Sequence, residues 1–293
     1  MNGELEKTKR FPRILIHAHV FYLNLWDELL ECINNYFSVC EEKYCIDVFL
    51  TYPEDDKEIL EKLKLDLPKA VIISVCNRGY DIGPFIEVLH HVDLNQYDYI
   101  VKLHTKRNLD NAWVNYRCYN GNEWRRELLS FCSTKENVKQ TMDAFSKQAD
   151  LGMIASSKMI DPSGMGSCHH SLLKNDAILE LGIKTNSKTV VWGTMFMVRA
   201  SLFKPFLKWT ISDFDFAPGR NTHEHIINGL TFIAECAFGK VVEGQGFRIS
   251  NGRGFVWANK IESWFKLIVF TLLRYASDGV RLLKSKCINK KTL

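Results

Sequence analysis

The stretch AVIISVCNRGYDIGPFIEVL (residues 70–89) joins an apolar run to a segment with helical spacing through a short polar junction. The run is rich in β-branched residues and is typical of a buried strand, whereas residues 82–92 have the periodicity of a helix. The junction contains Asn77, Arg78, Gly79 and Asp81. The sequence therefore predicts a strand that passes through a polar turn into a helix.

The same order of strand and helix recurs around this stretch. Strand-like runs occupy 13–22, 45–52, 70–75 and 97–104, and helical patterns occupy 23–37, 55–65 and 82–92. Strands that alternate with helices predict an α/β fold, Rossmann-like, with a mainly parallel sheet and helices on both faces. In open sheets of this kind ligands bind beyond the carboxyl ends of the strands, which is where the polar junction lies.

The alternation loosens after residue 104. Residues 105–124 have a loop-like composition, and helical patterns follow at about 122–132 and 134–148. Further predictions are a strand at 151–157, a strand entering a helix at 189–203, and a helix at 221–238. Because no linker rich in Pro or Gly divides the chain, we predict one domain over residues 1–258 followed by a basic amphipathic segment, 259–293.

Composition narrows the class of protein. The chain has 293 residues, of which 46% are hydrophobic and 25% charged, so it is globular rather than disordered. Nine cysteines without a CxxC pair or a Cys/His ligand spacing indicate reduced thiols, not a disulfide framework or a zinc site. The N-terminus is charged and has no apolar run, so we expect no secretory signal and a cytoplasmic protein.

The positive charge is concentrated at the C-terminus. Residues 260–293 contain eight Lys or Arg against two acids, a local charge of +6, whereas the whole chain carries +4. About ten apolar residues in the stretch 263–286 are too few to span a bilayer. The segment suits an amphipathic helix on the anionic inner leaflet of the membrane or on a partner protein, or a core helix with a solvated basic end.

The ends of two predicted strands carry candidate ligand-binding groups. Gly79 can adopt a left-handed backbone, and the following helix could offer free amides to an anion; the alternative is a plain turn capped by Asp81. His104 and Lys106 are two residues apart on an extended chain and so point to one face, where they could hold a phosphate-bearing ligand. The alternative is a solvated strand end.

Five motifs in order resemble those of the rhamnan synthesis protein F family, glycosyltransferases of bacterial surface polysaccharide assembly. They are IHAHVFY, NRGYDIGPF, YDYIVKLHTKRN, EWRRELL and WGTMFMVRASLF, and the resemblance covers residues 13–250. It implies an A-type glycosyltransferase fold, a nucleotide-sugar donor with rhamnose as the best-known sugar, and a lipid-linked glycan acceptor.

The resemblance also implies a donor site. Its expected contacts to the nucleotide, sugar or diphosphate are Asn77, Arg78, Gly79, Asp81, His104, Lys106 and Arg125. Many A-type transferases have an Asp-x-Asp metal motif where this chain has His104, Thr105 and Lys106. Lys106 can offset diphosphate charge directly, so a divalent metal (Mg²⁺ or Mn²⁺), with Asp81 as its ligand, remains an open alternative.

Catalysis is expected to use a carboxylate or a histidine as general base. Glu235 resembles the Glu of the family's Glu-Arg pair, although Cys236 replaces the Arg, and Asp81 is a second candidate. Trp192, Gly193 and Thr194 match the acceptor-side strand. Other residues could have either a functional or a structural role. The structural roles are a core residue for Trp124, a helix cap for Glu224, which lies between His223 and His225, and exposed loop residues for His169 and His170.

The sequence is therefore interpreted as an inverting, nucleotide-sugar-dependent glycosyltransferase, peripheral to the inner face of the cell membrane and without a nucleic-acid partner. A non-catalytic scaffold subunit of a polysaccharide-assembly complex remains the alternative, because the Asp-x-Asp motif is missing and the Glu-Arg pair is altered. A nucleotide-binding α/β enzyme of another reaction type is a third interpretation.

Overall fold

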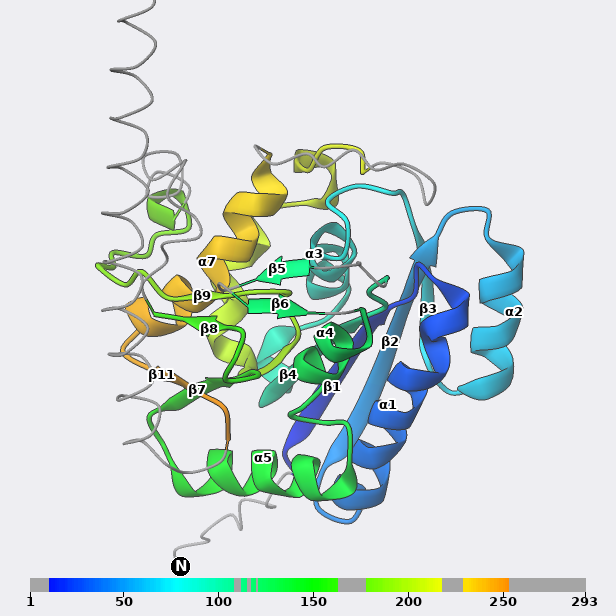
Figure 1. Cartoon of the computed structure of the whole chain (residues 1–293), viewed down its shortest axis with the longest axis horizontal. Helices are drawn as coiled ribbons and strands as arrows, with labels where there is room; N and C mark the ends of the chain where they lie inside the picture. The colour runs from blue at the N-terminus through cyan, green and yellow to red at the C-terminus, as the bar shows by residue number, and fades with distance from the viewer. Residues whose placement is uncertain are drawn as a thin grey trace, which may run out of the picture.

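The structure, a computed structural model, describes residues 11–107, 112–114, 117–119, 121–162, 178–217 and 229–252. Its centre is a seven-stranded sheet in the order β11-β7-β10-β4-β1-β2-β3 (Figure 1). The strands are β1 (Arg13–His19), β2 (Cys45–Pro53), β3 (Val71–Val75), β4 (Tyr99–His104), β7 (Leu151–Ile154), β10 (Phe196–Arg199) and β11 (Arg248–Ser250).

The sheet is mostly parallel, as the sequence predicted. β1 pairs in parallel with β2 and β4, β2 with β3, and β7 with β11. β10 runs antiparallel to both of its neighbours, β4 and β7. Because of this reversal, the start of β10 lies at the carboxyl end of β4, where the site described below is found.

Helices cover both faces of the sheet, which confirms the predicted α/β layers (Figure 1). Along β1, Ile14, Ile16 and Ala18 belong to one core and Leu15 to the other, as the alternation of side chains in a strand requires. The first core includes α1 (Trp26–Cys40), α2 (Lys57–Asp66) and α5 (Lys135–Lys147); the second includes α3 (Ile82–His91), α7 (Leu230–Gly244) and the 3₁₀ helix Ala200–Lys208.

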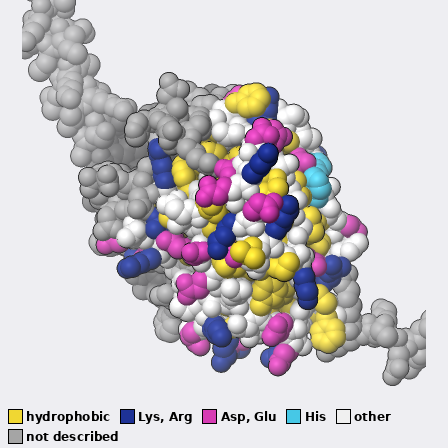
Figure 2. Space-filling view, turned by 90° about the vertical axis from the view of Figure 1, so that its right-hand side faces the viewer, with side chains coloured by type: hydrophobic (Ala, Val, Ile, Leu, Met, Phe, Trp, Pro, Cys, Tyr) yellow, Lys and Arg dark blue, Asp and Glu magenta, His cyan; other side chains and the backbone are white. Residues whose placement is uncertain are grey.

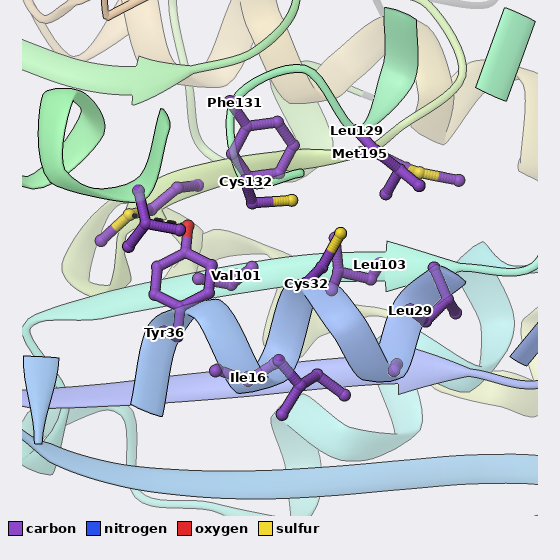
Figure 3. Close-up of a cluster of buried hydrophobic side chains, with 14 of the residues drawn as sticks. Ile16, Leu29, Cys32, Tyr36, Val101, Leu103, Leu129, Phe131, Cys132 and Met195 are labelled. Atoms are coloured by element: carbon purple, nitrogen blue, oxygen red, sulfur yellow. Dashed lines mark hydrogen bonds between the residues drawn. The ribbon is translucent and has the colours of Figure 1, made fainter. Parts of the chain in front are cut away.

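Figure 3 shows the core between α1 and the sheet. Leu29, Cys32 and Tyr36 recur at helical spacing on α1, and all three are buried. The Tyr36 hydroxyl donates a hydrogen bond to Met197 Sδ at 3.6 Å, which satisfies the polar end of a ring otherwise surrounded by apolar groups. Its burial raises the pKa of Tyr36 well above the usual value.

Aromatic rings dominate the second core. Neighbouring ring centroids lie 4.9–6.2 Å apart among Phe85, Phe196, Phe203, Phe206 and Phe238. Such offset and edge-to-face contacts contribute about 0.5–1.5 kcal/mol each beyond the burial of apolar area. The cluster joins α3, β10, the 3₁₀ helix and α7, so it fixes the elements that carry the site.

Several elements differ from the prediction. The segment predicted as a loop contains a hairpin of β5 (Ala112–Val114) and β6 (Arg117–Tyr119), followed by α4 (Gly121–Leu128). The predicted strand at 189–203 is divided into β9 (Val190–Val191), which pairs with β8 (Ile160–Asp161), and β10. The helix predicted within it is a 3₁₀ helix that contains Pro205, which cannot donate to a helical hydrogen bond.

Short 3₁₀ turns lie at Leu23–Leu25, Leu94–Gln96 and Ile211–Asp213, and residues 178–180 are also helical. The helix predicted at 221–238 is described from Leu230 onward and continues to Gly244. The predicted C-terminal amphipathic helix lies outside the described residues. Within the described ranges, no helix has the length and apolar character needed to cross a bilayer.

The edge of the sheet that carries β3 and α2 has a mixed surface. Figure 2 shows basic and acidic side chains interspersed with apolar ones on this face. Local ion pairs account for part of the pattern, since Lys62 lies 3.0 Å from Asp66 and Lys64 lies 3.0 Å from Glu61 along α2. Such exposed pairs contribute little to stability, at most about 0.5 kcal/mol each.

Candidate functional site

Polar side chains gather at the carboxyl ends of the central strands, on the face covered by α3. They are His17, His19, Thr51, Lys102 and His104, and all are buried. The parallel register places His17 beside Lys102, and His19 beside both Thr51 and His104. Residues that are register partners share a face, so two rows of polar groups lie next to each other.

Lys102 is the centre of this polar cluster. Its side chain is fully buried, and its Nζ donates to Asp81 Oδ2 at 2.5 Å, to Thr194 Oγ1 at 3.0 Å and to the Thr194 carbonyl at 3.1 Å. The Thr194 hydroxyl in turn donates to Asp81 Oδ2 at 2.5 Å. All three donors of the ammonium group are therefore used, and β4, the start of α3 and the start of β10 are held together.

The approach to β10 has an unusual backbone. Gly193 and Thr194 have φ angles of 74° and 52°, which lie in the left-handed region. A Cβ atom at Gly193 would lie 2.4 Å from Leu128 Cδ2, so α4 packs directly against this glycine. Thr194 keeps a conformation that is costly for a residue other than glycine, and its contacts with Lys102 and Asp81 hold it there.

Glu235 reaches the same place from α7. Its Oε1 accepts a hydrogen bond from the Gly193 amide at 2.9 Å. Burial raises the pKa of Glu235 above its usual range, although Lys106 and the Gly193 amide oppose the shift. A carboxylate with a raised pKa is a better proton acceptor than an ordinary one, which is the property required of a general base.

Asp81 has the opposite character. Burial alone would raise its pKa, but the positive charges of Lys102 and Lys106 hold the pKa of Asp81 well below the usual range. It stays ionised and is a weak base. Burial lowers the pKa of Lys102, with Asp81 opposing, and lowers that of His104 well below the usual value. His104 is therefore a neutral imidazole in the folded protein.

Two further histidines share the hydroxyl of Thr51. His17 Nε2 lies 2.9 Å and His19 Nδ1 lies 3.0 Å from Thr51 Oγ1. His17 stacks on Phe85 with ring centroids 5.5 Å apart, and burial lowers its pKa well below the usual value. His19 lies level with His104 and His17 lies deeper along the strands, and their contacts with Thr51 tie β1 to β2.

The polar junction holds a second chain segment. Asn77 Nδ2 donates to the Ala217 carbonyl at 2.9 Å, and the Gly79 amide donates to the Asp215 carbonyl at 2.9 Å. The Arg78 guanidinium donates to the Phe214 carbonyl at 2.8 Å and lies 3.7 Å from the centre of the Phe216 ring. Asn77, Arg78 and Gly79 thus fasten residues 214–217 beside the site.

The start of α3 matches neither of the two predictions, which were an anion site at free helix amides and a plain turn capped by Asp81. Asp81 occupies the N-cap position but makes no capping hydrogen bond, because its carboxylate turns to Lys102 and Thr194. The amides of Ile82 and Gly83 donate to the Gly79 carbonyl at 2.9 and 3.2 Å. These two amides are therefore not free for an anion, in contrast to the expectation for this helix.

Arg125 lies at a different place from the Lys102 cluster. Its Nε and Nη2 atoms bind the two carboxylate oxygens of Glu28 on α1 at 2.8 and 2.7 Å, and its side chain is 9% exposed. It lines a cavity of about 280 Å³ between α1 and α4. Trp124 is buried, as the structural alternative predicted.

Trp192, the first residue of the predicted acceptor motif, follows β9 and contacts the end of β8. Its indole Nε1 donates to Asp161 Oδ2 at 3.4 Å. The candidates His169, His170, His223, Glu224 and His225 lie outside the described residues.

The described residues do not fit a divalent cation. They contain no group of three or more His, Cys, Asp or Glu arranged to hold a metal ion. Asp81 Oδ2 already accepts hydrogen bonds from the Lys102 ammonium group and the Thr194 hydroxyl. Mg²⁺ and Mn²⁺ prefer several oxygen ligands, which this arrangement does not supply.

Sequence reasoning missed Lys102, although a signal for it was present. The run YIVKLH is an apolar strand with one lysine, and that lysine shares a face with His104. A lysine inside a buried strand needs an anionic partner, which the chain supplies at Asp81. His17, His19 and Thr51 were missed because the runs that contain them were interpreted only as strands.

Comparison with known proteins identifies similar sequences. The family model described as Rhamnan synthesis protein F matches residues 3–235. Two relatives, each an uncharacterized protein WxcX from a strain of Xanthomonas campestris pv. campestris, are 25% identical over 252 residues. The match covers 82% of this chain and 32% of each relative, so the chain spans about a third of the length of these curated relatives.

Proposed function

The chain belongs to the rhamnan synthesis protein F family, and from this premise we propose that it transfers a sugar from a nucleotide-sugar donor to a growing polysaccharide. The family name indicates a role in polysaccharide synthesis and makes rhamnose the first sugar to test. The proposal includes an A-type glycosyltransferase fold, for which the mostly parallel sheet with helices on both faces is supporting evidence.

The observation that carries the proposal is the pairing of two carboxylates with opposite properties at one edge of the sheet. Glu235 has a raised pKa and Asp81 a depressed one, and both are within the electrostatic reach of Lys106. Neighbouring titratable groups whose pKa values shift in opposite directions are typical of active sites. In such sites one group serves as the general base and the other binds the substrate.

In the proposed reaction Glu235 is the general base. The acceptor hydroxyl attacks the anomeric carbon of the donor sugar, and Glu235 takes the proton of that hydroxyl. The bond between the anomeric carbon and the donor phosphate oxygen breaks, and its electron pair leaves with the nucleoside diphosphate. Attack from the side opposite the leaving group inverts the anomeric configuration.

Lys106 is proposed to neutralise the charge of the leaving diphosphate. It lies just after β4 and is only partly buried. Its charge affects the pKa values of Asp81, Lys102, His104 and Glu235. A flexible ammonium group can act as a point charge on phosphate. The described residues supply this cation and no oxygen-rich metal site, so the proposed step uses no metal ion.

The acceptor and the location of the protein are also proposals. The acceptor is a lipid-linked glycan, and the basic segment 259–293 holds the protein against an anionic inner leaflet. Support comes from the local charge of +6 over residues 260–293 and from the apolar run within it.

The experiment that tests the function is a donor screen followed by a product assay. The full chain is heated with nucleotides that carry rhamnose, glucose, galactose or mannose, because a ligand that binds the folded state raises its apparent stability. The stabilising donor is then incubated with the chain, with or without an acceptor, and release of nucleoside diphosphate is followed. Glu235→Gln should bind the donor like wild type and release product at least about 100-fold more slowly.

Two results would contradict the proposal. If no donor stabilises the chain or is consumed, the scaffold interpretation replaces it. If Glu235→Gln retains the wild-type rate, another group is the base.

A further inference from the structure

We infer that Asp81 and His104 together recognise a hydroxyl group on the sugar part of the donor, and that they are not contacts for its diphosphate. The inference rests on the proposed function, since it concerns the same site. It assigns to these two residues the discrimination among donor sugars.

The first observation is that the two carboxylate oxygens of Asp81 differ in their contacts. Oδ2 accepts from Lys102 Nζ and from the Thr194 hydroxyl, both at 2.5 Å. Within the described part of the chain Oδ1 makes no hydrogen bond, and 13% of the Asp81 side chain remains exposed. One oxygen therefore fixes the carboxylate in place and the other is left to accept a hydrogen bond from a ligand.

The second observation is the state of His104. Its side chain is 2% exposed, and among the described residues neither ring nitrogen has a hydrogen-bond partner. Nδ1 lies 3.5 Å from Asp81 Oδ2 without forming a hydrogen bond. Leaving such buried polar atoms unpaired is destabilising, and structures usually satisfy them with water or a ligand.

The chemistry of the pair selects the kind of ligand group. A phosphate oxygen only accepts hydrogen bonds, and so does the ionised Asp81 carboxylate, so the two repel each other. Burial lowers the pKa of His104, and a neutral imidazole supplies no positive charge to a diphosphate. A hydroxyl group both donates and accepts, so it can donate to Asp81 Oδ1 and accept from the N–H of His104.

Lys102 and Thr194 act as positioning residues for this contact. They hold the carboxylate through two hydrogen bonds to Oδ2 and bind each other, so little ordering is needed when a ligand arrives. A donor that lacks the recognised hydroxyl would leave two polar groups unpaired, which is the arrangement by which a site rejects a deoxy analogue most strongly.

The test compares each nucleotide sugar with its own nucleoside diphosphate. Dissociation constants are measured by calorimetry for the full chain and for His104→Phe, which keeps a buried ring and removes both nitrogens. We expect His104→Phe to bind the nucleoside diphosphate within about twofold of wild type and the nucleotide sugar about tenfold more weakly. His17→Phe, which removes a deeper imidazole of the same face, should change neither constant.

Deoxy donors identify the hydroxyl and provide a second, independent readout. The analogue that lacks the recognised hydroxyl should bind wild type more weakly than the complete donor binds His104→Phe, because it loses the contacts to both Asp81 and His104. Removing the hydroxyl should cost less affinity in His104→Phe than in wild type, because the contact to His104 is already absent from the variant. Asp81→Asn should show the same non-additivity toward the same analogue.

The outcomes separate this inference from the proposed function. If His104→Phe weakens the nucleoside diphosphate and the nucleotide sugar equally, the contact is to phosphate or ribose and the inference is wrong. If His104→Phe binds both like wild type, His104 lies outside the ligand contact and the inference is also wrong. If wild type binds no nucleotide and no nucleotide sugar, the proposed function itself fails.

Discussion

Lys102 Nζ lies 2.5 Å from Asp81 Oδ2, and this ion pair joins the central strand β4 to the residue that precedes α3. The lysine is fully buried, whereas 13% of the Asp81 side chain is exposed. The ammonium group is therefore separated from water, and its contact with Asp81 offsets the loss of hydration.

The pair predicts a non-additive effect on stability. Lys102→Met leaves the Asp81 charge without its partner, so we expect the free energy of unfolding to fall by about 3 kcal/mol. The double variant Lys102→Met/Asp81→Leu should recover most of this loss, because apolar side chains often replace a buried pair without cost. Urea denaturation measures each value.

A surface pair serves as the control for this comparison. Lys64 and Glu61 lie 3.0 Å apart, but their side chains are 55% and 72% exposed. Lys64→Met should change the free energy of unfolding by less than about 0.5 kcal/mol. Additive losses in the Lys102 and Asp81 variants would contradict the interpretation of a coupled pair.

Stability should decrease as the pH falls below about 6.5. Burial lowers the pKa of His17 and of His104, so both are neutral in the folded protein. In the unfolded chain they take up protons near the usual value of 6.5, and the unfolded state gains protons that the folded state does not. Each histidine should contribute a slope of about 1.4 kcal/mol per pH unit below that value.

Urea denaturation between pH 7.5 and 5 measures this slope. His104→Phe should remove one of the two contributions. Asp81 acts in a lower window: its depressed pKa makes its contribution complete above the unfolded value of 3.8 and lost as the pH falls below it. An unchanged slope in His104→Phe would show that this imidazole titrates equally in both states.

Gly193→Ala should destabilise the protein more than Gly246→Ala. Both glycines have positive φ angles, 74° and 85°, so alanine is strained by about 1 kcal/mol at either position. At Gly193 the added Cβ also meets Leu128 at 2.4 Å, whereas at Gly246 it meets nothing within 4 Å. We expect an additional loss of about 1–3 kcal/mol at Gly193, measured by thermal or urea denaturation. Equal losses would mean that Leu128 moves freely.

Lys106 and Arg125 should separate ligand binding from stability. Lys106→Met is expected to weaken donor binding by on the order of tenfold and to leave unfolding unchanged, because a charge-assisted contact to phosphate is lost. Arg125→Met should lower the free energy of unfolding by about 1 kcal/mol, since Glu28 loses its two-point partner. Calorimetry and denaturation on both variants give the comparison. Equal losses of donor affinity in two folded variants would restore Arg125 to the donor site.

The parallel half of the fold could be predicted because its signals are local. β1 to β4 and α1 to α3 each show their own periodicity, and the predicted and observed bounds differ by a few residues. The reversed direction of β10 has no such signal. Its residues Phe196, Met197 and Val198 are apolar and would pack equally well in either direction, so neighbours distant in the sequence decide the pairing.

The candidate site also has parts that could be predicted from the sequence and parts that could not. His104 and Glu235 were predicted as site residues because strand ends and the family resemblance indicate them, and both interact electrostatically with Lys106. The contacts of Asn77, Arg78 and Gly79 with residues 214–217 could not be predicted, because backbone carbonyls accept these hydrogen bonds and any sequence supplies them.

The position of β10 has a consequence for the order in which the sheet is assembled during synthesis. β1 to β4 are made first and can pair with one another, since each has a neighbour among them. β7 emerges next, but both of its neighbours, β10 and β11, come later in the chain. A nascent chain that ends after β7 therefore exposes one side of β4 and both sides of β7, which are edges open to pairing with other chains until β10 arrives.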